Sequence, residues 1–233
     1  MEKFDFNQAT FKAHSALKQE GFLLKRSHVG EILAAALGYM TYAALATESA
    51  DETLDLHLAD AEYVVLSVPL ALARAHEFVL ALPKDVVEKV IEVIIEITVA
   101  EWPQAYHGIA GFVDDHLSEY FTDAMTFADE TSNAQAESNA QFPYMVEVED
   151  IQPESDDLWT ARESWSASAS GAMSGEYDPA GDRLFNGDKV HCSATVTFLK
   201  AGRGGLVFSH VDTNAAAGDW GDDAKYDEPM AQD

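Results

Sequence analysis

The chain of 233 residues contains 41 Asp and Glu residues against 14 Lys and Arg residues, which gives a formal net charge of −27 at pH 7. Because 47% of the residues are hydrophobic, the chain can bury a core, and disorder of the whole chain is excluded. The negative charge repels phosphate backbones, so direct binding of nucleic acid is not expected.

The sequence also indicates a compartment. Cys192 is the one cysteine, so an intramolecular disulfide and a zinc site built from several cysteines are both excluded. The first six residues lack the basic and apolar regions of a secretory signal. Charged residues interrupt the two most apolar stretches, 63–82 and 86–99, so no membrane span is expected. We therefore expect a cytoplasmic protein, and no motif in the sequence calls for a cofactor.

Residues 1–130 show the spacing of apolar residues that is typical of helices. Gly21 and Gly38 can end the first two helices in a left-handed conformation, and Thr41 can cap the third. The predicted helices cover residues 7–20, 28–37, 41–48, 67–82, 84–101 and 111–130, with a short strand or extended segment at 63–66. This part is predicted to form a helical domain.

Within that domain, residues 8–48 form a helical module with four short segments that carry a family resemblance. The segments are Ser27–His28, Glu31–Leu33, Leu37–Tyr39 and Tyr42–Leu45. They resemble the short helical module known as glyoxalase-related in bacterial proteins, and the similarity continues at 61–66 and 74–75. The resemblance implies a compact helical unit at the N-terminus. It implies no reaction, because that module is not the glyoxalase catalytic fold.

The pattern changes after residue 130. Residues 131–141 are polar and repeat the sequence Ser-Asn-Ala-Gln, which is typical of a linker or a fraying helix end. Residues 145–149 and 190–198 then alternate between apolar and polar side chains, and the glycine-rich segment 202–205 can turn the second strand back into 206–211. We therefore predict an α+β protein, in which a small antiparallel β domain at 142–211 follows the helical domain.

The last segment, residues 212–233, contains seven acidic residues and one lysine. Such a composition is typical of a disordered tail. Order in this segment would require a basic surface of the same chain or a partner.

Metal binding is one functional alternative. Imidazole and carboxylate groups at helical spacing can converge on a divalent ion, and the candidate ligands are His107, His116 and Glu119, with Asp114 and Asp115 beside them. His-x-x-Glu is frequent by chance in so acidic a chain, and adjacent residues of a helix point in different directions. A solvated helix face is therefore the favoured interpretation, and a metal-dependent enzyme that uses the His107 and His116 region is the alternative.

Two further alternatives involve nucleic acid. Helices 28–37 and 41–48 could form a helix-turn-helix, but residues 42–48 contain no Arg, Lys, Asn or Gln to contact bases or phosphates. The acidity could instead imitate the phosphates of a duplex, so that the chain would be a DNA-mimic inhibitor of a nucleic-acid-binding protein. High acidity also serves solubility alone.

The sequence contains no phosphate loop, dinucleotide motif or nucleophile elbow. We therefore interpret the chain as a non-enzymatic protein-interaction or adaptor protein of a bacterial accessory system, for example in phage defence or in a mobile element. A protein partner or a second copy of the chain is expected on the β domain, because large amphipathic side chains are favoured at interfaces. The candidate contact residues are Trp159, Trp165, Tyr177, Phe185 and Trp220.

Overall fold

The computed structural model describes residues 5–78, 83–101, 104–138, 140–153, 158–177 and 189–218. The fold is α+β, as predicted. The chain divides into two compact units. Unit 1 consists of residues 1–115, 155–165 and 197–209, and unit 2 of residues 116–154, 166–196 and 210–233.

Unit 1 contains the helices that the sequence predicted. They are α1 (Phe6–Gln19), α2 (Arg26–Ala36), α3 (Tyr42–Ser49), α4 (Val68–Phe78) and α5 (Lys84–Glu101). The short helix α6 (Gly108–Phe112) overlaps only the start of the predicted helix 111–130. Gly21 and Gly38 have φ values of 93° and 91°, and the Thr41 hydroxyl accepts a hydrogen bond from the Ala44 amide at 3.1 Å. The left-handed glycines that end α1 and α2, and the Thr41 cap of α3, were therefore predicted correctly. Residues 79–82 of the predicted fourth helix lie outside the described residues.

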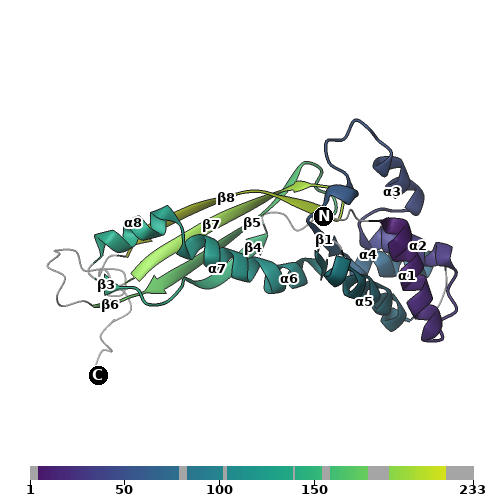
Figure 1. The fold of residues 1–233 in the computed structure, drawn as a ribbon, viewed down its shortest axis with the longest axis horizontal. Coiled ribbons are helices and arrows are strands. Elements are labelled where there is room, and N and C mark those ends of the chain that lie inside the picture. The colour runs from purple at the N-terminus through teal and green to yellow at the C-terminus, as the bar shows by residue number, and fades with distance from the viewer. Residues whose placement is uncertain are drawn as a thin grey trace, which may run out of the picture. The chain divides into compact units, whose positions relative to one another are not determined.

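The core of this unit is centred on α2. Nearly every side chain from Val29 to Leu37 is buried, and α2 packs against α1, α3, α4 and α5. Figure 1 shows these helices gathered beside the short strand β1 (Tyr63–Leu66). On α5 the residues Val86, Val87, Val90 and Ile91 are buried, so burial offsets the poor helix propensity of the β-branched residues.

A second cluster in unit 1 is aromatic. Phe112 is fully buried at the end of α6, and its ring centroid lies 5.0 to 6.0 Å from those of Tyr63, Tyr106, Trp165 and Phe198. Tilted and edge-on arrangements at such distances are favourable for aromatic pairs. The cluster fixes β1, β2 (Gln104–His107) and the ends of two later strands on one another.

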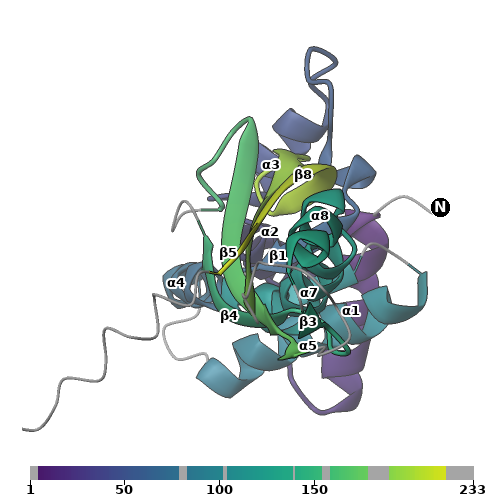
Figure 2. The same cartoon turned by 90° about the vertical axis from the view of Figure 1, so that its left-hand side faces the viewer.

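The predicted helix 111–130 is divided into several elements. A single π-helical turn (Val113–Leu117) follows α6 and leads into α7 (Ser118–Thr126). Helix α7 ends before Ala128, whose backbone is extended, and α8 (Asp129–Glu137) begins at the next residue. Most of the predicted linker 131–141 is therefore helix, because Thr131 and Ala134 are buried and anchor α8. Figure 2 shows α7 and α8 on one side of strands β4 and β5.

The strands form a mixed sheet of six strands in the order β2-β1-β8-β7-β5-β4. The C-terminal strands are β4 (Glu147–Pro153), β5 (Ser164–Ser174), β7 (Lys189–Lys200) and β8 (Gly205–Ala217), while β3 (Ala140–Gln141) pairs with β6 (Glu176–Tyr177). The prediction of a separate small antiparallel domain was wrong. Strands β1 and β2 of the N-terminal region belong to the sheet, where they pair in parallel, and Tyr63 pairs with Leu206 of β8.

The beginning of the predicted acidic tail is also part of this sheet. Strand β8 continues to Ala217, so residues 212–217 are strand. Their low β propensity is overcome by specific contacts, since the Thr213 hydroxyl lies 3.0 Å from a Glu130 carboxylate oxygen and the Gly218 amide donates to the Lys189 carbonyl at 2.8 Å. Residues 219–233 lie outside the described residues. None of the helices in the described ranges is long and apolar enough to cross a membrane.

Candidate functional site

The candidate site is a pocket of about 700 Å³ in unit 1, which we call the hairpin pocket because the end of β7 and the turn after it form one wall. Another wall comes from the chain before β5, and a third from the end of α3 and the loop that follows it. The lining residues are Glu48, Thr53, Leu54, Asp55, Leu56, Trp159, Thr160, Ala161, Arg162, Glu163, Leu199, Lys200, Gly202 and Arg203.

Glycines shape the turn between β7 and β8. Gly202 has a φ of +72°, and a Cβ atom at this position would lie 2.6 Å from the Tyr39 hydroxyl. A Cβ atom on Gly204 would lie 3.0 Å from the carbonyl oxygens of Leu37 and Val65. The predicted glycine-rich turn is therefore confirmed, and its glycines are needed because the turn packs closely against the helical module and β1.

Lys200, the last residue of β7, is only 6% exposed. Its Nζ donates hydrogen bonds to the carbonyl oxygens of Leu158 at 2.9 Å and Arg203 at 2.6 Å. Burial lowers the pKa of this amine to about 7, although the nearby Glu48 carboxylate opposes the shift. The side chain therefore ties the turn to the chain before β5 and places a titratable amine in the wall of the pocket.

Tyr39, Glu48 and Arg203 form a polar group next to the turn. The Tyr39 hydroxyl donates to a Glu48 carboxylate oxygen and accepts from the Arg203 amide at 3.2 Å. Burial, followed by the hydrogen bond to Glu48, raises the pKa of Tyr39 well above its usual range. The Arg203 guanidinium lies 5.5 Å from the Tyr39 ring centroid, and its Nε lies 4.0 Å from Glu48. This group joins α3 to the turn.

Trp159 is the predicted contact residue that lies in the pocket. Its indole nitrogen donates to the Val65 carbonyl at 3.0 Å, and its side chain is half-buried. Trp165 is 2% exposed and belongs to the aromatic cluster, so it does not contribute to a contact surface. Phe185, Trp220 and the side chain of Tyr177 lie outside the described residues.

The three predicted metal ligands come from different elements. His107 is exposed at the end of β2, His116 is half-buried in the π-helical turn, and Glu119 is exposed in α7. Burial lowers the pKa of His116, and Glu119 opposes this shift. Within the ranges that the structure describes, no group of three or more His, Cys, Asp or Glu side chains is arranged to hold a metal ion.

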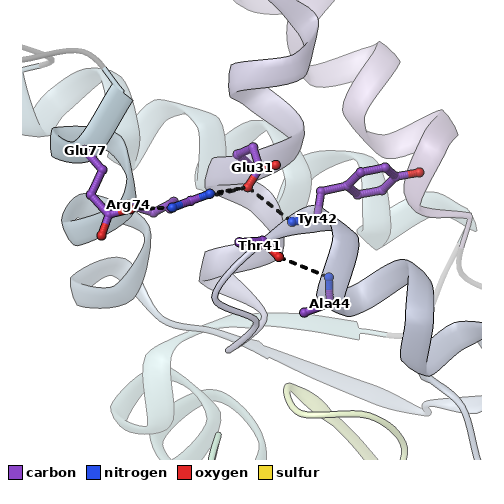
Figure 3. A network of polar contacts seen from close by, with 6 residues as sticks. All are labelled: Glu31, Thr41, Tyr42, Ala44, Arg74 and Glu77. Carbon is purple, nitrogen blue, oxygen red and sulfur yellow. Dashed lines mark hydrogen bonds and ion pairs between the residues drawn. The ribbon is translucent and has the colours of Figure 1, made fainter.

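A second polar network joins the helical module to α4, and Figure 3 shows it from close by. A Glu31 carboxylate oxygen accepts hydrogen bonds from the Arg74 guanidinium at 2.9 Å and from the Tyr42 amide at 3.2 Å, and Arg74 also pairs with Glu77. The network connects α2, the start of α3 and α4 (Figure 3). Glu31 bonds to groups of α3 and α4, and Arg74 also pairs with Glu77 within α4, so the network orients the helices.

Sequence reasoning missed Tyr39, Glu48, Lys200 and Arg203 as site residues. A signal for Lys200 was present, because the alternation that buries every second residue of β7 from Val190 to Phe198 continues to residue 200. The position of Arg203 in a glycine-rich turn was visible, but its partner Tyr39 is 164 residues away. Comparison with known proteins gives no family: no family model, curated protein or solved structure matches the chain.

Proposed function

We propose that this chain is a non-enzymatic interaction protein, and that the hairpin pocket receives a segment of a protein partner. The observation that carries the proposal is the lining of the pocket, which combines apolar side chains with side chains of both charges. Leu54 and Leu199 are 39% and 42% exposed there, and the half-buried Trp159 lies beside them. Apolar and aromatic side chains among polar ones are characteristic of protein interfaces.

The local charge also supports binding. The whole chain has a net charge of −27, yet the pocket brings three basic residues together with three acidic ones. The basic residues are Arg162, Lys200 and Arg203, and the acidic ones are Glu48, Asp55 and Glu163. An acidic partner segment therefore meets much less repulsion in the pocket than the average surface of the chain would give it.

The bonds of the polar groups favour binding over catalysis. The Lys200 amine is held by two backbone carbonyls, and the Glu48 carboxylate by the Tyr39 hydroxyl. A general base must lie within hydrogen-bond reach of the proton that it takes, and a nucleophile must be free to reach the substrate. Groups that are committed to holding the turn against α3 and against the chain before β5 support a rigid receptor more than a proton-transfer site.

The test uses a photo-crosslinking amino acid at position 54, in the pocket, and at position 23 as a matched control. Both positions hold exposed leucines of unit 1, and Leu23 is 94% exposed outside the pocket. We expect one protein of the native host to crosslink at position 54 and not at position 23. The purified partner should then bind the wild-type chain and the Leu23→Asp variant equally well.

The Leu54→Asp variant decides the outcome, because an added charge in a partly apolar pocket should weaken binding at least about tenfold. Equal binding of both variants by the purified partner would place the interface elsewhere and refute the proposal. Metal analysis separates the enzyme alternative: stoichiometric metal that is lost in both His107→Ala and His116→Ala would favour a metal-dependent enzyme.

A further inference from the structure

The feature that leads beyond a general interaction role is the charge of Lys200. A buried ammonium group is expensive unless a counter-ion accompanies it. No ion pair joins Lys200 to a carboxylate among the residues that the structure describes. Its two acceptors are neutral backbone carbonyls, which satisfy two of the three N–H groups of an ammonium. Within the described ranges, the third N–H group has no hydrogen-bond acceptor and no carboxylate forms an ion pair with the charge.

The other charged groups of the pocket do not neutralise this amine. Glu48 is the acidic group that acts on Lys200, but its carboxylate accepts from the Tyr39 hydroxyl and faces the Arg203 guanidinium. Glu163 reaches the lysine through its backbone carbonyl, which accepts from the Lys200 amide at 3.0 Å. Asp55, Arg162 and the side chain of Glu163 are exposed at the rim.

We infer that the hairpin pocket binds a carboxylate group of its ligand, which pairs with the Lys200 ammonium at the wall and with the guanidinium of Arg203 or Arg162 nearer the rim. The inference rests on the proposed interaction function and adds the chemistry of the ligand. Trp159, Leu56 and Leu199 would contact the apolar part next to the carboxylate. The carboxylate can come from an acidic side chain or from the C-terminus of a peptide, and the experiment separates these sources.

Binding of a carboxylate has a pH signature in this pocket. The free amine is half-protonated at about pH 7, because burial lowers its pKa. A bound carboxylate would raise that pKa again, so binding takes up a proton. If the pKa returns fully to the ordinary value of 10.5, the affinity should rise by up to about 30-fold from about pH 8.5 to about pH 6. A neutral ligand would show no such gain.

The experiment follows the lysine Cε signals of the full chain by NMR, with Lys200→Met to assign the signal of Lys200. The probes are sodium acetate and three short peptides. One is acetyl-Leu-Glu-Leu-amide with a side-chain carboxylate, one is acetyl-Leu-Leu with a free C-terminal carboxylate, and one is the neutral acetyl-Leu-Gln-Leu-amide. Sodium chloride at matched ionic strength controls for screening.

We expect a saturable shift of the Lys200 signal and a raised pKa with acetate and with at least one acidic peptide, but no shift with the neutral peptide. The acidic peptide that binds more tightly identifies the source of the carboxylate. Lys200→Arg should keep binding that Lys200→Met loses. Where Lys200→Met fails to fold, the pKa of the wild-type lysine and the loss of affinity in Arg162→Gln are the readouts.

Two results would overturn the inference. One is a dissociation constant above about 10 mM for acetate and both acidic peptides at about pH 6. The other is equal, pH-independent binding of the neutral peptide. Either result leaves the proposed function standing if Leu54→Asp still weakens binding of the crosslinked partner at least about tenfold. If Leu54→Asp binds the partner as well as the wild-type chain does, while the carboxylate probes bind as expected, the proposed function is refuted instead.

Discussion

The most direct test of the described pocket is the pH dependence of stability that Lys200 should cause. Its pKa is about 7 in the folded chain, against an ordinary value of 10.5. Between these two values the unfolded chain binds more protons than the folded chain, so the free energy of unfolding rises with pH. Well below about pH 7 the lysine is protonated in both the folded and the unfolded chain. The full free-energy cost of burying the ammonium group then lowers the stability of the folded chain.

The magnitude follows from the size of the shift. At about 1.4 kcal/mol per pKa unit, the shift to about 7 corresponds to about 5 kcal/mol over the whole window. Between about pH 7.5 and 9.5 the expected gain in the free energy of unfolding is about 2.5 kcal/mol, because the folded chain is already largely deprotonated there while the unfolded chain is still mostly protonated. The Asp and Glu carboxylates stay ionised throughout this range, so their contribution is nearly constant.

Cys192 acts in the opposite direction, and so, near pH 9.5, do the tyrosines whose pKa is raised by burial, for example Tyr63 and Tyr106. Burial raises the pKa of the Cys192 thiol, so the folded chain keeps this proton at a pH where the unfolded chain loses it. Cys192 therefore lowers stability as the pH rises toward 9.5. Carrying out the measurement in a Cys192→Ala background removes this effect from the comparison.

The assay is urea unfolding at constant ionic strength, followed by tryptophan fluorescence, for the Cys192→Ala chain and the same chain with Lys200→Met. Methionine keeps the length of the side chain and removes the charge, although the carbonyls of Leu158 and Arg203 lose their donor. We expect the free energy of unfolding to rise with pH in the chain that contains Lys200. In the Lys200→Met chain it should change much less. Parallel pH profiles of the two chains would show that Lys200 is charged and solvated in the folded state, which would refute the reasoning.

Three further predictions use the same unfolding assay. Gly202→Ala should destabilise the chain by about 1–3 kcal/mol more than the control Gly108→Ala. Both glycines have a positive φ, but of the two only Gly202 lies where a Cβ atom would meet a neighbouring atom. Equal losses of stability would show that the turn moves freely. Phe112→Ala should cost about 3–5 kcal/mol, against less than about 1 kcal/mol for the exposed Phe11, and similar losses would place Phe112 outside the core. Glu31→Gln should cost about 1 kcal/mol at low salt, because the carboxylate pairs with a partly exposed arginine; a loss that does not shrink in high salt would contradict this electrostatic origin.

The sequence predicted the helices well because their signals are local. Thr41 caps α3 through an amide three residues later, and Gly38 ends α2 through its own backbone conformation. Neither feature depends on distant parts of the chain. The β7–β8 turn was found for the same reason, since its glycines and the alternating strand before it are adjacent in the sequence.

The sheet was predicted less well because its pairing is long-range. Tyr63 lies opposite Leu206 and Val64 opposite Gly205, but a four-residue strand such as β1 contains no information about its partner. The region after residue 130 was therefore interpreted as a separate domain. The same limit applies to the pocket, where Tyr39 and Glu48 meet a turn that lies more than 150 residues later in the chain.

Lys200 shows where local and long-range information combine. The alternation of β7 places residue 200 on the buried face, so the sequence itself puts an amine where an apolar side chain would be less costly. Two backbone carbonyls could equally be satisfied by a neutral amide, which costs less to bury than an ammonium. What lysine adds is a positive charge in the wall of a pocket, within a chain that has 41 acidic residues and 14 basic ones. A charge of this kind becomes favourable when an anion pairs with it, and for that reason we assign Lys200 to ligand recognition as well as to the structure of the turn.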